Sequence, residues 1–420
     1  MNRTLVFFLI TLSYNNLAWS EYKLSLEDIK KFALANNFGA KATEAEVQEI
    51  KAQTSQKRSE TLPQLSLVTG PGLRSQDNKT ESNTVGYVEG RWNIYRGSQD
   101  RIDFEVSELN EKIAETKNGK VQFELELDVE GLFYKYLYKD IQIMNLQHSL
   151  ELTQKHKQFI KMRKISGMAS EADIMEFELR ESFLKSELSS LVQEKEEVKL
   201  GLLRLMGPNL DTQFEPFGDI PHTHLEKSLT QFLAQINSTS SNLKVDALAV
   251  AKGALELKKA RYTWFPRIDL EMKYGKLSQE IAQSYPAVEG SLLLKWEFFS
   301  GMKTAGFIAE NMAKSSRLNF EFQQKLLHTM TEAEINYTKL SSIQERIHGE
   351  DGNELRAQKY YTSVLSDYRR GVKNGADLKV AEELLLMAKN RRAELRFQFI
   401  DTKIRLEKAL GLFIETTVHR

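Results

Sequence analysis

One long stretch occurs twice in the sequence, and this duplication decides the fold. The first copy, Gly167–Gly207, reads GMASEADIMEFELRESFLKSELSSLVQEKEEVKLGLLRLMG, and the second copy, Gly371–Gly411, reads GVKNGADLKVAEELLLMAKNRRAELRFQFIDTKIRLEKALG. Both copies run from glycine to glycine, at an offset of 204 residues (371 minus 167). A repeat of this length indicates two copies of one large unit rather than a solenoid of short repeats.

The same offset extends upstream without a gap. It aligns Trp92 with Trp296 and Gly97 with Gly301. The sequence therefore predicts two structural repeats, which cover 21–207 and 224–420 and are joined by a linker at 208–223.

Each repeat is predicted to contain, in order, a helix, a β-hairpin, a long helix and a second helix. Apolar residues at helical spacing indicate the helices, and no proline falls inside them. Alternation indicates the strands, most clearly RIDLEMKY at 267–274, where apolar and charged residues occupy opposite faces. The predicted helices are 25–62, 98–166, 171–206, 225–265, 302–370 and 375–410, and the predicted strands are about 64–73, 86–96, 267–276 and 288–299.

The helix lengths predict a rod. At 1.5 Å per residue, the helix over 98–166 would span about 100 Å, and the other helices of its repeat are about half as long. Two half-length helices stacked end to end match one long helix. The hairpins would then lie at one end of the rod, and the turns at 167–170 and 371–374 would lie at the other.

Composition excludes several classes of function. The 58 basic and 58 acidic residues cancel, so no net field would attract nucleic acid. The absence of cysteine excludes disulfides and thiol catalysis. The seven histidines form no HExxH, and no GxSxG or Walker loop is present, so no catalytic residue, metal or cofactor is expected. His222 and His224 have no third ligand at a suitable spacing, and we expect them in a surface loop.

Residues 1–20 are typical of a cleaved secretion signal. Asn2-Arg3 gives a short positive region, an apolar run follows, and Ala18-Trp19-Ser20 has the small-x-small pattern of a cleavage site. The apolar run is too short to span a bilayer as a helix.

The four predicted strands have the length of tilted membrane strands. Four strands cannot close, and unpaired strand edges in lipid are costly, so a membrane sheet would need more than one chain. Aromatic residues at one end of the return strands would form an interfacial girdle. The alternative is a soluble sheet covered by helices, with the same aromatics in its core. The girdle candidates are Trp92, Tyr95, Trp296, Phe298 and Phe299.

The order of these motifs resembles the TolC family of outer-membrane efflux and secretion channels over the whole mature chain. The residues that carry the resemblance are Gly167…Ala172-Asp173-Ile174, Tyr368-Arg-Arg-Gly371…Ala376-Asp377-Leu378, the closing Leu205-Met206-Gly207 and Ala409-Leu410-Gly411, the strand entries Leu62-Pro63 and Phe265-Pro266, and the two aromatic–glycine strand exits. The resemblance implies a mainly α protein with a small membrane β part. Three chains would form a 12-stranded β-barrel in the outer membrane, continuous with a long α-helical tunnel through the periplasm.

The resemblance also implies a function. The homotrimer would be the passive exit duct of a tripartite efflux pump or a type I secretion system. It would contact outer-membrane lipid and would open at its periplasmic tip when a membrane-fusion adaptor and an inner-membrane pump dock. Drugs, metals, polysaccharide and proteins are all compatible with a wide duct. The alternative is a periplasmic coiled-coil scaffold without a pore, whose helices would look the same.

The tip turns supply the candidate site residues. Docking would involve Gly167, Met168, Ala169, Ser170, Ala172, Gly371, Val372, Lys373 and Ala376. The entrance constriction would involve Asp173, Glu176, Asp377 and Arg370.

Asp173 and Asp377 have a second interpretation as caps of the helices that they begin. In the second repeat Val380 stands where Glu176 stands in the first, so a double acidic ring is not expected there. Two roles stay open for the basic tip residues, namely pairing across the entrance and contact with helix C-termini; these residues are Arg163, Lys164, Arg369, Arg370 and Lys373.

Overall fold

The computed structural model describes residues 22–76, 79–167, 169–207, 214–225, 228–231, 233, 240–276, 286–413 and 416–419. The predicted signal segment, 1–20, and residues 208–213 of the predicted linker lie outside the described residues.

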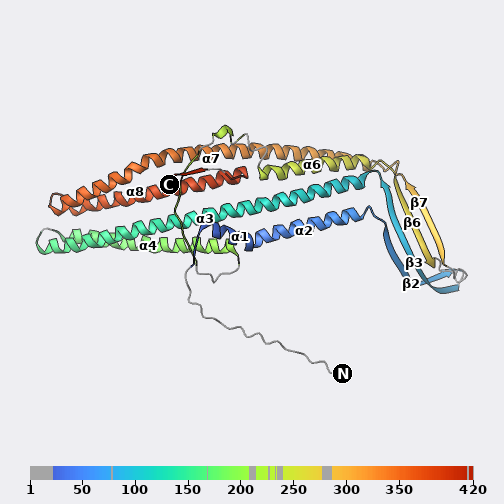
Figure 1. The fold of residues 1–420 in the computed structure, drawn as a ribbon, viewed down its shortest axis with the longest axis horizontal. Helices are drawn as coiled ribbons and strands as arrows, with labels where there is room; N and C mark the ends of the chain where they lie inside the picture. Colours follow the sequence, from blue (N-terminus) through green and yellow to red (C-terminus); the bar gives the residue numbers. More distant parts are fainter. Residues whose placement is uncertain are drawn as a thin grey trace, which may run out of the picture.

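The molecule is a rod with a β-sheet at one end and two helical turns at the other (Figure 1). Two 67-residue helices run its length, α3 (Gln99–Ile165) and α7 (Lys303–Arg369). The 36-residue helices α4 (Glu171–Met206) and α8 (Gly375–Leu410) return from the turns. The 22-residue helices α2 (Phe38–Ser59) and α6 (Ser241–Tyr262) cover the half nearer the sheet. The predicted fold class is confirmed in its mainly helical, twofold repeated arrangement.

The short helices meet end to end at the middle of the rod. In the second repeat, Asn242 Nδ2 donates to the carbonyl of Lys408 at 2.9 Å, which joins the start of α6 to the end of α8. In the first repeat, Asn37 Nδ2 donates to the carbonyl of Leu205 at 3.0 Å in the same way. Gly411 permits the close approach, because its φ is +67° and an added Cβ would lie 2.8 Å from Ser241 Oγ.

The predicted helix over 25–62 is in fact two helices. α1 (Leu26–Asn36) ends and α2 begins at Asn37, whose backbone is extended. The Asn37 side chain caps α2 by accepting from the amides of Gly39 at 2.8 Å and Ala40 at 3.2 Å. A continuous series of helix formers hides this break, although Asn36-Asn37 and Gly39 mark its position.

Two small sheets at the middle of the rod differ from the prediction. β1 (Tyr22–Leu24) pairs in parallel with β4 (Phe214–Pro216), and β5 (His222–Leu225) pairs antiparallel with β8 (Thr416–His419). His222 and His224 therefore lie in a strand rather than a loop. The predicted helix 225–265 is wrong at its start, because Leu225 is in β5 and α6 begins at Ser241. Segments of three or four residues are too short to show alternation, so the sequence does not reveal them.

The sheet at the end of the rod contains both hairpins in one antiparallel array. Its order is β2 (Gln64–Gln76), β3 (Lys79–Arg96), β6 (Arg267–Lys276) and β7 (Ala287–Lys295). β7 ends four residues before its predicted end at 299. Trp296, Phe298 and Phe299 therefore follow the strand, where the chain turns toward α7.

Candidate functional site: the sheet and the hairpin tips

One face of the sheet carries a network of charged side chains. Arg91 Nη2 lies 3.0 Å from Glu89 Oε1, and Lys273 Nζ lies 3.0 Å from Glu271 Oε1. Arg91 and Glu271 are direct partners in the register of β3 and β6, as are Glu89 and Lys273. Cross-strand pairs of opposite charge stabilise this arrangement and require a hydrated environment on this face.

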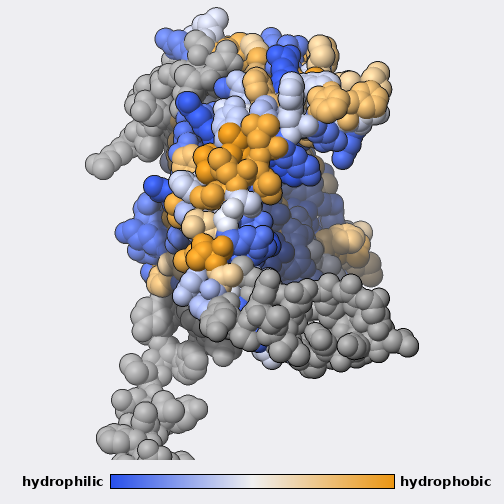
Figure 2. All heavy atoms as spheres, turned by 90° about the vertical axis from the view of Figure 1, so that its right-hand side faces the viewer, coloured by the Kyte–Doolittle hydropathy of each residue, from blue (hydrophilic) through white to orange (hydrophobic). Residues whose placement is uncertain are grey.

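The opposite face of the same sheet is apolar and bare. Its side chains include Leu65, Leu67, Leu270, Leu292 and Leu294, which the register places together with Val88, Trp92, Met272 and Tyr274. Most of these side chains are exposed, and Figure 2, which views the molecule from its sheet end, shows hydrophobic residues gathered in patches at the surface. A continuous exposed apolar face of this kind indicates contact with an apolar phase or a partner.

The aromatic residues lie where the sheet meets the helices. Trp92 Nε1 donates to the carbonyl of Thr61 at 3.0 Å, and Trp296 Nε1 donates to the carbonyl of Trp264 at 3.0 Å. Tyr95, Phe298 and Phe299 are exposed at the same junction. The sheet projects beyond the helices instead of lying beneath them (Figure 1). The alternative of a helix-covered soluble sheet, with these aromatics in its core, is therefore wrong.

At the other end of the rod, the two candidate acids cap helices. Ser170 N donates to Asp173 Oδ2 at 2.7 Å, and Asp173 N donates to Ser170 Oγ at 3.2 Å. Asn374 and Asp377 form the same reciprocal pair at 3.2 and 2.9 Å. These capping boxes fix the start of α4 and α8. They also hold both carboxylates at the outermost turn, on the exposed tip of the rod.

The basic residues of the tip make specific contacts. Arg163 Nη1 donates to the carbonyl of Tyr368 at 3.0 Å, and its guanidinium lies 5.1 Å from the centre of the Tyr368 ring. Arg163, near the end of α3, thus contacts the C-terminal turn of α7 in the other hairpin rather than that of its own helix. Lys164 pairs with Glu171, Arg370 with Asp367 and Lys373 with Asp377.

A buried polar cluster joins the two hairpins below the tip. His156 Nε2 of α3 lies 2.9 Å from Glu382 Oε1 of α8 and 3.2 Å from the hydroxyl of Tyr361 in α7. Thr153 donates to Glu382 Oε2 at 3.4 Å. Burial, with a smaller contribution from Glu382, raises the pKa of Tyr361 to about 12, so its hydroxyl stays protonated at neutral pH.

Two partly exposed ion pairs between α4 and α8 flank this cluster. Glu176 accepts from Lys379 Nζ at 3.0 Å, and Arg180 Nη1 lies 3.2 Å from Glu383 Oε1. Glu176 was expected in the entrance constriction, and here it links α4 to α8. The roles of His156, Glu382 and Arg180 were not predicted, because residues that contact partners more than 200 positions away leave no local pattern in the sequence.

Seven of the nine predicted docking residues are exposed at the tip. Gly167 and Gly371 have φ of +72° and +82°, which is the left-handed conformation that ends a helix and begins a turn. Ala169 is half-buried against the tip core, and Met168 lies outside the described residues. The exposed docking residues are Gly167, Ser170, Ala172, Gly371, Val372, Lys373 and Ala376.

Among the described residues, no three His, Cys, Asp or Glu side chains come together in a way that would hold a metal ion. Within the same ranges, no helix combines the length and the apolar character that crossing a bilayer requires.

Comparison with known proteins identifies this architecture. Residues 233–412 match the family model described as outer membrane efflux protein. The structure resembles the CmeC outer membrane channel of Campylobacter jejuni, with a TM-score of 0.83, 12% identity, and coverage of 97% of this chain and 94% of CmeC. No curated protein matches the sequence.

Two further solved channels have the same fold. The outer membrane protein VceC of Vibrio cholerae gives a TM-score of 0.81 at 14% identity and covers 93% of this chain and 97% of its own. The open state of the MtrE outer membrane channel of Neisseria gonorrhoeae gives a TM-score of 0.78 at 13% identity, and the match covers 93% of this chain and 89% of MtrE. The predicted resemblance to outer-membrane efflux channels is confirmed.

Proposed function

We propose that this chain is the passive exit duct of a tripartite efflux pump or a type I secretion system. The proposal is supported by the match of residues 233–412 to the outer membrane efflux protein family and by the fold. A homotrimer would form the duct. A periplasmic membrane-fusion adaptor and an inner-membrane pump would dock at the tip, and the pump would supply the energy. No residue would act as a catalyst.

The single observation that carries this proposal is the two-faced sheet. Its charged face is held by the Glu89–Arg91–Glu271–Lys273 network, and its other face is exposed leucine and aromatic surface. β2 and β7 are unpaired at the two edges of the four-stranded array. In lipid such edges must pair, so three copies would close a 12-stranded barrel with the charged face lining the lumen.

The tip supports the proposed entrance. Asp173 and Asp377 would form rings around the axis of a trimer, and acidic rings favour cations. Docking on the exposed turns would bias a closed–open equilibrium of the paired helices.

A periplasmic scaffold without a pore is not favoured. A scaffold needs only helices for its contacts, and an uncovered apolar sheet would be an aggregation hazard in water.

The first test of the proposal is a mass and fractionation measurement. The 48.3 kDa precursor should give a detergent-extracted species of roughly three times the chain mass in the outer-membrane fraction, because four strands per chain need partners to close. A soluble one-chain species would contradict the duct and favour the scaffold.

Two adjacent leucines provide a matched pair of variants for the same measurement. Leu294 and Leu293 are 65% and 54% exposed, but they lie on opposite faces of β7. Leu294→Arg places a charge on the apolar face, where the cost falls from about 2–4 kcal/mol at the bilayer midplane to about 0–1 kcal/mol near the interface, and should lower the yield of insertion. Leu293→Arg points toward the charged face and should insert at wild-type yield. Equal insertion of the two variants would contradict the assignment of the faces.

A further inference from the structure

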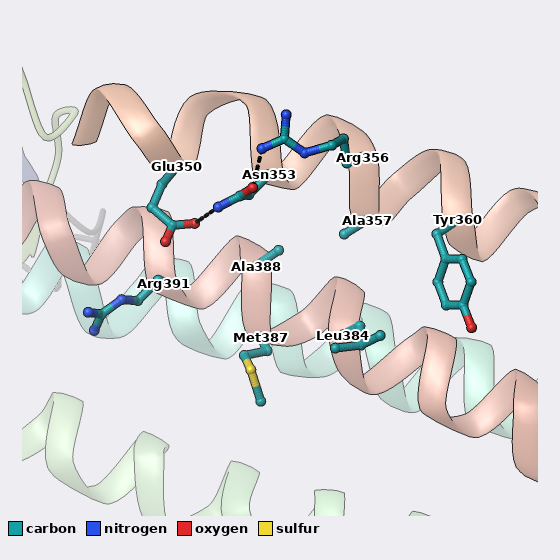
Figure 3. Close-up of a pocket in the computed structure, with 9 residues that line it drawn as sticks. All are labelled: Glu350, Asn353, Arg356, Ala357, Tyr360, Leu384, Met387, Ala388 and Arg391. Atoms are coloured by element: carbon teal, nitrogen blue, oxygen red, sulfur yellow. Dashed lines mark hydrogen bonds between the residues drawn. The ribbon is translucent and has the colours of Figure 1, made fainter. Parts of the chain in front are cut away.

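Two hollows in the surface have different linings. One is a groove of about 500 Å³ between α7 and α8, whose lining combines Leu384 and Met387 of α8 with hydrogen-bonded polar side chains of α7 (Figure 3). The other is a hollow of about 350 Å³ in the apolar face of the sheet. The side chains that this face contributes to its lining are apolar or aromatic, and they include Leu65, Trp92 and Met272.

The hollow in the sheet lies over a glycine of β3. Gly90 pairs with Leu65 of β2 on one side and with Met272 of β6 on the other, and both neighbours line the hollow. A Cβ added at Gly90 would meet Leu65 Cδ2 at 3.2 Å, so a side chain at this position would enter the space. The hollow therefore exists because β3 has no side chain here.

The fold of the sheet does not require a glycine at this position. Glycine inside a strand often marks a bulge, a tight bend or a place where a ligand or another backbone approaches closely. Gly90 does not have a positive φ, and the register shift of β3 lies further along the strand, between Asn93 and Tyr95. The nearest backbone atom outside the adjacent residues, the carbonyl oxygen of Met272, would be 4.0 Å from an added Cβ. The close approach of a ligand remains as the reason.

The second repeat has a large side chain at the matching position. The offset of 204 residues maps Gly90 onto Leu294 and Trp92 onto Trp296. Both tryptophans are held in the same way, by an indole N–H that donates to a backbone carbonyl at 3.0 Å. The two repeats thus present the same aromatic residue, but the first has a hollow beside it where the second has a leucine.

We propose that the hollow over Gly90 binds one acyl chain of a phospholipid from the periplasmic leaflet of the outer membrane. The ligand must be apolar, because the indole N–H of Trp92 already has a partner and the charged residues of the lining, Arg91 and Lys273, belong to the charged face of the sheet. Trp92 lies where the sheet meets the helices, which is the periplasmic side of the proposed duct. This inference rests on the proposed duct, because the sheet meets lipid only as part of a barrel that spans the membrane.

A chain in the hollow would differ from the lipid around the rest of the sheet. Its methylene groups would contact side chains on several sides, whereas a chain on a flat surface contacts protein on one side. An empty hollow would deprive the surrounding side chains of these contacts. The bound chain should therefore stay in place when the other lipid is diluted by detergent.

Quenching of tryptophan fluorescence by a phospholipid with brominated acyl chains tests this inference. The mature chain has three tryptophans, Trp92, Trp264 and Trp296, because Trp19 belongs to the predicted signal segment. Trp264→Phe with Trp296→Phe leaves Trp92 as the reporter, and Trp92→Phe with Trp264→Phe leaves Trp296. Each full-length protein would be reconstituted in vesicles of the brominated phospholipid and then diluted stepwise with detergent.

We expect both reporters to be quenched in the vesicles, because both lie on the face that meets lipid. On dilution, quenching of Trp92 should persist to a lipid-to-detergent ratio roughly tenfold lower than quenching of Trp296, because each additional buried methylene corresponds to about a fourfold preference. Gly90→Leu, which gives the first repeat the residue of the second, should abolish this difference. Leu294→Gly should give Trp296 the same persistent quenching.

The outcomes separate this inference from the proposed duct. If Trp92 and Trp296 lose quenching at the same ratio in a protein with the light-scattering mass of a trimer, the hollow holds no chain and the duct stands. Quenching of Trp296 alone would show that another part of the assembly covers the hollow, and it would overturn the inference in the same way. If neither reporter is quenched in the vesicles, the apolar face does not meet lipid, and the duct is contradicted together with the inference.

A smaller substitution keeps the test decisive if Gly90→Leu fails to assemble. Gly90→Ala adds only the Cβ, which requires Leu65 to move by a few tenths of an ångström. It should reduce the difference between the two reporters without abolishing it. An unchanged difference in an assembled Gly90→Ala protein would contradict a chain seated over this residue.

Discussion

The two tip hairpins, α3–α4 and α7–α8, follow one pattern but differ in what covers their sides. Both begin their return helices with a capping box, and both turn at a glycine of positive φ. The side of the first hairpin is covered by α8, through buried and ion-paired contacts. The matching side of the second hairpin is an open groove with exposed apolar residues.

The two hairpins agree at residues that fix the repeat and differ at residues that would serve assembly in the proposed homotrimer. The residues that cap helices or orient the sheet, such as Asp173 and Asp377 or Trp92 and Trp296, are the same type in both halves. The residues on the sides of the hairpins have diverged, from charged at Arg180 to apolar at Leu384. A surface between segments of one chain tolerates hydrated ion pairs. A surface between copies must also supply the free energy that offsets the entropy of association.

The largest effect is expected from a charge placed in the groove. If copies of the chain meet at this groove in the proposed homotrimer, Leu384→Glu would bury a carboxylate there and lose an apolar contact between each pair of copies, at a cost of at least ~2 kcal/mol per contact. Light scattering in detergent should show loss of the trimer at protein concentrations where wild type remains assembled.

The control for this variant introduces the same residue at the matching position of the first hairpin. Arg180→Glu faces Glu383 of α8 within one chain, where the two side chains are 16% and 39% exposed and repulsion is only partly screened. It should lower the unfolding temperature of the chain and leave the trimer mass unchanged. If Arg180→Glu dissociates the trimer as readily as Leu384→Glu, the two hairpins do not differ as proposed.

A smaller effect is expected from Glu332 and Arg204, onto which the 204-residue offset maps the ion pair of Asp128 with Lys408. Glu332→Arg or Arg204→Glu alone should weaken the trimer, by about 0.2–1 kcal/mol per exposed pair. The double reversal should restore it. The measurement is trimer dissociation over a series of detergent concentrations at low and high salt, since screening should reduce the difference between the variants.

The matched pair within one chain is Asp128 with Lys408. Reversing Lys408 alone should change the thermal stability of the chain but leave its assembly intact. Failure of the double reversal at 332 and 204 to restore assembly would contradict a pairing of these two residues between copies.

Most of the fold could be predicted because its signals are local and repeated. Strict alternation at 267–274 indicated a two-faced strand, and the structure shows the charged face paired across β3 and β6. Pro63 and Pro266 follow helices, as the fixed φ of proline requires. The break at Asn37 was not predicted, because the helix propensity of its neighbours favours a continuous helix. The break is stabilised by a contact with a distant helix, the hydrogen bond of Asn37 to the carbonyl of Leu205 in α4.

The tip illustrates what a sequence alone leaves open. The two interpretations of Asp173, as helix cap and as entrance acid, rest on the same position in the first turn of a helix. The structure shows the capping contacts, and the entrance ring remains part of the proposal. The junction of the first hairpin with α8 could not be predicted, because His156 and Glu382 are single polar residues on amphipathic helices and become partners only when α8 packs on α3.

The smallest change to the structure, with a selective effect on function, is expected at the turns. Gly371 has a φ of +82°, and an added Cβ would meet only Arg163 Nη2 at 3.8 Å, so a side chain fits in space but strains the backbone. Gly371→Asn keeps a residue that tolerates this conformation and should preserve both assembly and export.

Gly371→Trp should assemble with at most about 1–2 kcal/mol of local strain, while its side chain covers the proposed docking surface. Export in cells that contain the adaptor and the pump should therefore fall for the tryptophan variant alone. Normal export by a trimeric Gly371→Trp protein would remove the second turn from the docking surface, and the same pair of substitutions at Gly167 would then show whether the two hairpins also differ in what binds their tips.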